Sequence, residues 1–246
     1  MKKIFLFSLL YILIFSCEER NEISITKLVG SPDYSSAKLS LEDSIKNKDG
    51  EYNLSFKVEN YVLGMQTLKD FDHKLANSDK GQHIHFIVNN GPYSAHYEEN
   101  FSKPLDEESN VILAFLSRSY HESVKNKDAF ILTQVGDKKI DLDNELLFYS
   151  RPKGTYRGDA KDKVLLDFYL VNTSISATGN KVRATIQGQE FIIDEWAPYY
   201  IEGLGDGEIN IKLELIDNFG KLIDTPFNPS NSCLLYTSDA ADDETS

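Results

Sequence analysis

Cysteine is scarce in this chain of 246 residues, which has only two, at positions 17 and 233. Cys17 follows an apolar N-terminal run, and Cys233 begins an acidic tail. The long segment between them therefore has no disulfide and no thiolate ligand. This excludes zinc fingers, thiol catalysis and blue-copper sites, each of which needs a cysteine. Any metal site in the folded part must use histidine and carboxylate side chains.

Positive charge is also in short supply. The chain has 26 lysines and arginines against 39 aspartates and glutamates, a formal net charge of −13, and the acidic residues are scattered. Because no basic face is visible to hold a phosphate backbone, nucleic acid is not an expected partner. Such a field favours cations only weakly.

Helical periodicity is missing, whereas short alternating segments separated by polar turns recur along the chain. The pattern predicts an all-β protein of two tandem β-sandwich domains, immunoglobulin-like or cupredoxin-like. We expect these boundaries: a first domain over 37–136, a connection over 137–163, and a second domain over 164–232 that is truncated at its end.

The two halves resemble each other. Residues 81–88 correspond to residues 179–186, and residues 111–116 correspond to residues 210–215. The chemistry differs between the copies, since the second has Lys181 and Arg183 where the first has two histidines. A metal site is therefore expected in the first copy only.

Three of the five histidines lie between Gly81 and Tyr97. His83 and His85 are two residues apart on a predicted strand, so both rings are on one face. His96 follows the turn after that strand, and His121 lies at the end of another strand. This spacing predicts a copper or zinc site of His83, His85, His96 and His121, with Glu98 or Glu122 as acceptors for the ring N–H groups. The alternative is that these histidines are polar residues on a solvated face or in a hydrogen-bonded loop.

A second hypothesis is an anion or peptide site built from basic side chains, whose planar or cationic heads suit phosphate and carboxylate. Its residues are Arg118, Arg151, Lys153 and Arg183, with Arg157 nearby in the sequence. Such residues also pair with acids on ordinary surfaces. The aromatic segment from Trp196 to Tyr200 is either a glycan or peptide platform or a packed corner.

A third hypothesis is a hydrolase, with Ser94, Ser117 or Ser119 as nucleophile and His96 or His121 as base. The sequence has no nucleophile elbow, no HExxH pattern and no paired carboxylates. We therefore expect a protein that is not an enzyme.

The ends of the chain carry targeting and processing signals. Residues 1–17 have two lysines, an apolar run and a final Ser16-Cys17, which is typical of a secretory signal and resembles a bacterial lipobox. Cys17 would then be the lipidated first residue, followed by a tether over 18–36. The acidic pair after Cys17 resembles a surface-export tag, so both the cell surface and the periplasmic side of the outer membrane stay open. Residues 233–244 resemble a translated sequencing adapter, and we expect the whole tail over 233–246 to lie outside the fold.

Several motifs together resemble a family of exported lipoproteins of the Bacteroidota that is commonly labelled "phosphopeptide-binding protein". The motifs are GQHIHFIVNNGPYSAHYE, LAFLSRSYHES, FYSRPKG and LLDFYLVN, and the resemblance covers nearly all of residues 25–230. The Gly-x-His-x-His strand is also similar to histidine-rich exported β-domains, which implies a binding or metal-handling module. The sequence thus predicts a lipid-anchored, extracytoplasmic, non-enzymatic binding protein, for a metal ion or alternatively for phosphate, peptide or glycan.

Overall fold

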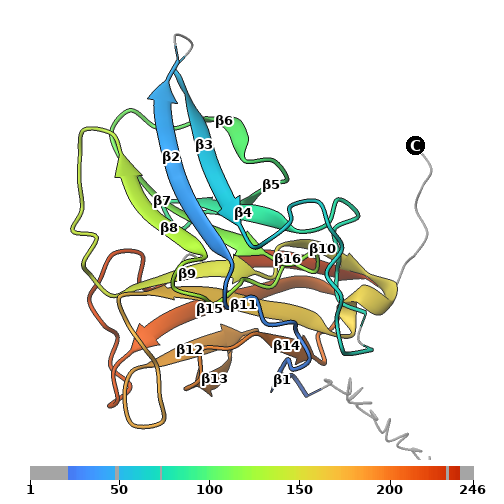
Figure 1. Ribbon diagram of the computed structural model, residues 1–246. Helices are drawn as coiled ribbons and strands as arrows, with labels where there is room; N and C mark the ends of the chain where they lie inside the picture. The colour runs from blue at the N-terminus through green and yellow to red at the C-terminus, as the bar shows by residue number, and fades with distance from the viewer. Residues whose placement is uncertain (1–21, 48–49, 73, 231–232, 239–246) are drawn as a thin grey trace, which may run out of the picture.

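The computed structural model describes residues 22–47, 50–72, 74–230 and 233–238, and over these residues the chain is almost entirely β-structure (Figure 1). The strands form four sheets, in which one strand pair is parallel and the others are antiparallel. The single helical element in this part of the chain is a short 3-10 helix, η1 (Gly158–Lys161). No helix among the described residues is long and apolar enough to cross a membrane. The predicted all-β fold of β-sandwiches is confirmed.

The first sandwich is built from the first half of the chain. Its outer sheet has the order β2-β3-β6, with β2 (Lys38–Lys46), β3 (Glu51–Glu59) and β6 (Asn100–Pro104). Its inner sheet has the order β5-β4-β7-β8, with β4 (His83–Val88), β5 (Ser94–His96), β7 (Asn110–Ser117) and β8 (Phe130–Val135). Alternate residues of facing strands, such as Phe56 on β3 and Phe86 on β4, form the core between the two sheets.

The second sandwich contains the rest of the strands. One sheet has the order β1-β14-β11-β9, with β1 (Ser24–Lys27), β9 (Leu146–Arg151), β11 (Val164–Val171) and β14 (Tyr199–Glu202). The other has the order β10-β16-β15-β12-β13, with β10 (Gly154–Arg157), β12 (Lys181–Ile186), β13 (Gln189–Ile193), β15 (Gly207–Ile216) and β16 (Cys233–Ser238). The core between these sheets is again made by alternate apolar side chains, for example Phe168 and Leu213.

The two sandwiches are joined face to face by a buried apolar layer. Ile87, Leu113 and Phe115 of the first sandwich pack with Phe148 and Tyr169 of the second. The rings of Phe115 and Tyr169 are stacked with centroids 4.8 Å apart. Figure 1 shows the resulting stack of layers, with β2 and β3 at one end and β12 and β13 at the other. The strands β4, β7, β9 and β11 are therefore covered on both faces, which explains why they read as continuous runs of buried residues.

The internal repeat predicted from the sequence is present in the strand pairing. His83 of β4 is paired with Ser117 of β7, and Lys181 of β12 is paired with Ile216 of β15, so both halves use the same register. The two copies differ in what their equivalent faces meet. The face of β4 that carries His83 and His85 is buried against the second sandwich, whereas Lys181 and Arg183 on β12 are only partly buried.

The structure corrects several predicted boundaries. The predicted tether over 18–36 contains β1, which pairs with β14 of the second sandwich. The predicted connection over 137–163 contains β9 and β10, two strands of that same sandwich. Part of the excluded tail over 233–246 forms β16, which pairs with β15 at the place that β8 takes beside β7 in the first half. Each of these segments joins a sheet through long-range pairing, which its own sequence does not specify. The signal segment over 1–17, with Cys17, lies outside the described residues.

Candidate metal centre

His83 and His85 lie on the face of β4 that meets the second sandwich, and both are fully buried. Their Nε2 atoms are 2.9 Å apart. This face is the one that the alternation in the sequence predicts, because Ile84 and Phe86 point the other way into the core of the first sandwich. The two rings therefore converge on one point between the sandwiches.

The residues just before β4 hold His83 in place. Gly81 has a φ of +82°, and a side chain there would meet the backbone of Gly64 and Met65, with the nearest oxygen at 2.4 Å. Only glycine fits such a close approach. The carbonyl oxygen of Gly81 is 2.8 Å from Nδ1 of His83 and accepts its N–H. That hydrogen bond leaves Nε2 of His83 as the nitrogen with a free lone pair, which faces the centre of the cluster.

His121 completes the cluster from a tight turn after β7. Its Nδ1 lies 3.1 Å from Nε2 of His83. The turn holds His121 in the left-handed region, with a φ of +71°, which is uncommon for a residue with a side chain. In the second half the equivalent turn follows β15, and Gly220 takes the corresponding position with a φ of +83°. The first half therefore has an imidazole where the fold favours glycine, a strained arrangement of the kind found at functional sites.

Together, the ligand atoms of His83, His85 and His121 lie within 4.8 Å of one another. The ring of Tyr93 stacks on His85 at a centroid distance of 3.7 Å, and its hydroxyl is 3.4 Å from Nδ1 of His121. Ser150, on β9 of the second sandwich, has its hydroxyl 3.3 Å from Nδ1 of His85. All three ligand residues come from the first copy, as the sequence predicts, and the second half adds one wall of the site.

His96 does not belong to this cluster. On β5 it is paired with Ile84, so it shares the face of Ile84 and points into the first sandwich, away from His83 and His85. There its ring stacks on Phe101 at a centroid distance of 3.4 Å, and its Nε2 is 2.9 Å from the hydroxyl of Ser94. The predicted set of four histidines is thus reduced to three.

The environment keeps the clustered histidines neutral. Burial lowers the pKa of His83 to about 4, with a further contribution from the Arg151 guanidinium. Burial, together with Arg151, lowers the pKa of His121 to about 2. The pKa of His85 lies well below its usual range, first because of burial and then because of His83. Near neutral pH the three rings are therefore in the uncharged form that binds metal ions.

These shifts predict an acid-sensitive fold. His83 in the unfolded chain has a pKa of about 6.5, whereas its pKa in the folded protein is about 4. Between these pH values the unfolded state binds a proton that the folded state does not bind. Stability therefore falls as the pH is lowered from about 6.5 toward 4. From His83 alone we expect a loss on the order of 1–2 kcal/mol in the free energy of unfolding between pH 6.5 and pH 5. Urea titrations with a chelator present measure this. The loss should be smaller in His83→Gln, and an identical pH profile in that variant would contradict the assignment.

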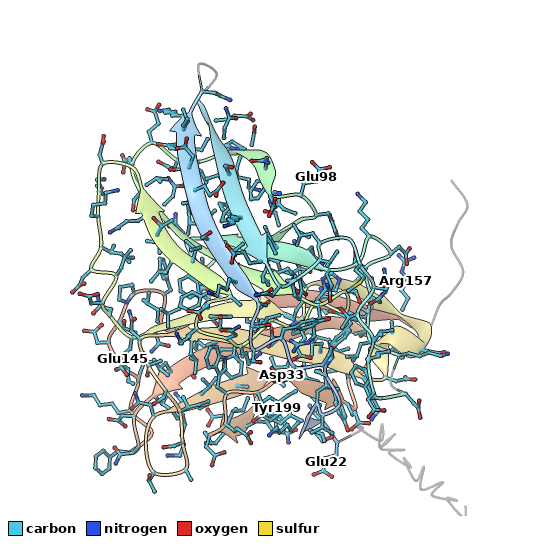
Figure 2. The ribbon with its side chains drawn as sticks, in the orientation of Figure 1. Glu22, Asp33, Glu98, Glu145, Arg157 and Tyr199 are labelled. Carbon is cyan, nitrogen blue, oxygen red and sulfur yellow. The ribbon has the colours of Figure 1, made fainter. Side chains whose placement is uncertain are left out.

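The basic residues proposed from the sequence do not converge. Arg118 is buried and forms an ion pair with Glu122 at 2.9 Å, and Arg183 pairs with Glu214 at 2.8 Å in the second sandwich. Figure 2 shows Arg157 on the outer side of the molecule, where it is exposed. Arg151 and Lys153 remain together beside the cluster. The first donates to the hydroxyl of Tyr93 at 3.0 Å, and the second to its carbonyl oxygen at 2.7 Å.

The predicted carboxylate acceptors are elsewhere. Glu98 is exposed and points outward in Figure 2, and Glu122 is engaged by Arg118 and by the hydroxyl of Ser31. The carbonyl oxygen of Gly81 and the hydroxyl of Ser150 take their place. The sequence could not reveal these partners, because one is a backbone atom and the other comes from a strand 65 residues away.

The serines of the hydrolase hypothesis are placed as follows. Ser94 and His96 form a pair, but no carboxylate of the described residues hydrogen-bonds to that histidine, so the third member of a triad is not supplied there. The side chain of Ser117 donates to backbone carbonyls, and that of Ser119 accepts from the N–H of Thr67.

The aromatic segment after β13 is a packed corner. Trp196 donates from Nε1 to the carbonyl oxygen of Phe168 at 3.1 Å, and its ring meets that of Tyr169 edge-on. Both contacts hold the Trp196 ring against the protein. They argue against the hypothesis that this segment is a platform for a glycan or peptide.

Comparisons with known proteins bear on the fold alone. No protein-family model matches the chain, and no curated protein matches it. Among solved structures it is similar to the fibronectin(III)-like modules of Clostridium thermocellum CbhA, with 12% identity, 85% of this chain and 98% of that chain covered, and a TM-score of 0.31. It is also similar to the FN1–FN3 domains of chicken CNTN1 (8% identity, 82% and 65% covered, TM-score 0.24). A Bacteroides ovatus protein, SGBP-B, solved with a mixed-linkage heptasaccharide, matches at 11% identity, with 82% and 60% covered and a TM-score of 0.22.

Proposed function

We propose that this protein is a non-enzymatic metal-binding protein whose site lies between its two sandwiches. The observation that carries the proposal is the convergence of three neutral imidazoles, His83, His85 and His121, with their ligand atoms within 4.8 Å of one another. Three histidines and an open position form a set that zinc and copper both accept.

A hydrogen-bonded network accounts less well for this geometry. Nε2 of His83 has a single lone pair, because the other ring nitrogen donates to Gly81. That one lone pair faces two ring nitrogens, on His85 at 2.9 Å and on His121 at 3.1 Å. An ion at the centre would instead receive one lone pair from each ring. The left-handed backbone of His121 supports the same conclusion. The first half keeps a strained histidine at a position where the second half has the unstrained Gly220.

The spacing of the nitrogens favours copper(II) over zinc. At about 2.0–2.1 Å from one ion, as in zinc–imidazole sites, the nitrogen of His83 subtends an angle of about 90–100° with that of His85 and with that of His121 at the distances seen here. Ligand atoms of the cluster lie up to 4.8 Å apart, more than the roughly 4.2 Å that two nitrogens on one ion allow, so His85 or His121 must shift inward on binding. Angles near 90° suit the tetragonal geometry of copper(II), whereas zinc prefers tetrahedral angles. We therefore propose copper as the preferred ion and zinc as the alternative.

The cellular setting we propose follows from the N-terminal segment. Lipidation at Cys17 would anchor the protein in the outer membrane, on its periplasmic side or at the cell surface, in accord with the resemblance to exported Bacteroidota lipoproteins. The site would then bind its ion outside the cytoplasm.

Calorimetric titration of the full chain with copper(II) and with zinc(II) tests the proposal. We expect one ion per chain, tighter binding of copper(II), and protons released to a small extent because the rings are already neutral. The matched control is His96→Gln, which removes a histidine on the opposite face of the same sheet from His83 and His85. Metal binding by this variant should equal that of the unaltered chain. Absence of stoichiometric binding, or binding that is lost in His96→Gln, would contradict the proposal.

A further inference from the structure

Two cationic side chains lie beside the three histidines. Arg151, at the end of β9, is 5% exposed, and its Nη1 donates to the hydroxyl of Tyr93 and to the carbonyl oxygen of Lys153. Lys153 reaches back over the ring of Tyr93, with Nζ 4.6 Å from the centroid. Both cations act on the histidines, since they contribute to lowering the pKa of His85 and of His121.

Arg151 has no carboxylate partner within the described part of the chain, and its guanidinium lies over the rings of Tyr93 and Tyr156, 5.8 and 5.9 Å from their centroids. Among the described residues its Nε is buried without a hydrogen-bond partner. Asp167, its neighbour across the ladder with β11, is engaged by Lys125 and by the backbone N–H of Ser123. A buried guanidinium without a counter-charge is costly, and a bound anion would supply the missing charge.

A metal ion alone would make this imbalance worse. Three imidazoles add no negative charge, so a divalent ion would bring two more positive charges next to Arg151 and Lys153. Three protein ligands also leave at least one coordination position open. An anion in that position would complete the coordination and neutralise the cations. Lys153 is exposed and His121 is partly exposed, so this side of the site is the one that solvent reaches.

We propose that the ion bound by His83, His85 and His121 takes a small oxyanion as its further ligand, of carboxylate or phosphate type, held by Arg151 and Lys153. This inference rests on the proposed metal-binding function and names the ligand class of the same site. The planar, multiply donating guanidinium suits an oxyanion, whose oxygens accept from it while one oxygen binds the ion. The metal and anion hypotheses of the sequence thus describe one site.

The test uses the full chain loaded with one equivalent of copper(II) and titrated with acetate, inorganic phosphate and, for comparison, chloride. Visible absorption and electron paramagnetic resonance report changes at copper. We expect saturable binding of acetate or phosphate that exceeds the response to chloride. Loss of one charge-assisted hydrogen bond in Lys153→Gln or Arg151→Gln should weaken oxyanion binding to the copper-loaded chain about 10-fold or more.

Two controls separate the outcomes. Lys138→Gln alters an exposed lysine that pairs with Glu108, and it should leave oxyanion binding unchanged. Lys153 is exposed, so Lys153→Gln keeps the test valid if the buried Arg151→Gln variant fails to fold. Copper binding with an oxyanion response equal to that of chloride, or unchanged in Lys153→Gln, would overturn this inference and leave the metal-binding function standing. A chain that binds no copper would overturn both.

Discussion

Replacing His121 by glycine is expected to abolish tight metal binding without unfolding the protein. The variant removes one of three ligand nitrogens, and we expect the affinity for copper(II) to fall more than about 100-fold, beyond the 10–100-fold typical of losing a partner of a ligand. The backbone should tolerate the change, because the position has a φ of +71° and its equivalent in the second half is Gly220.

The stability of this variant decides between two roles for His121. Relief of the left-handed strain offsets the contacts that the imidazole loses with Tyr93 and His83, so the free energy of unfolding should change by less than about 1 kcal/mol without metal. Calorimetry and urea titration of the same preparation measure both quantities. Unchanged affinity would show that His121 is not a ligand. A large loss of stability would show that the imidazole is retained for the fold.

Replacing Phe115 by alanine is expected to cost about 3–5 kcal/mol of stability, the range for a large aromatic removed from a core. Phe115 is fully buried between the sandwiches, where it stacks on Tyr169 and meets the ring of His85 edge-on. Its loss would leave a cavity in the layer that joins the halves and would loosen the wall behind the metal site. Urea or thermal unfolding measures the change.

The matched control is Phe219→Ala. Phe219 lies in a turn of the second half and is 89% exposed, so its removal should change stability by no more than about 0.5 kcal/mol. Equal effects of the two substitutions would contradict the assignment of Phe115 to a buried interface. A Phe115→Ala variant that keeps its stability would mean that the two sandwiches are not held together by this layer.

The alternation of side chains predicted the main part of the site. On a strand, odd and even residues face opposite ways, so His83 and His85 had to share a face that excludes Ile84. The internal repeat is likewise visible in the sequence, and the structure gives both copies the same register, because β4 pairs with β7 as β12 pairs with β15. Both signals are local, and local periodicity is what a single sequence records well.

The position of His96 could not be predicted in this way. It follows a turn over 89–92, and the face on which it lies depends on the register that the turn imposes. Pairing with Ile84 places it in the first core, whereas a shift of one residue would have placed it with His83. The sequence named the residue but did not determine the register.

The contribution of the second half was missed because it depends on how the sandwiches pack. Ser150 and Arg151 reach the histidines from β9, in a segment that the sequence presented as a connection. Which face of one sandwich meets the other is set by apolar side chains spread over both halves, and no short motif reports it. Arg151 and Lys153 were therefore assigned to a separate hypothesis, although they lie beside the cluster.

Anomalous diffraction from crystals soaked in copper(II) would show directly whether an ion binds between the three histidines. We expect one strong peak between the two sandwiches, about 2.0 Å from ring nitrogens of His83, His85 and His121. A strongest peak at His96 or at surface carboxylates, with no density between the three histidines, would contradict it.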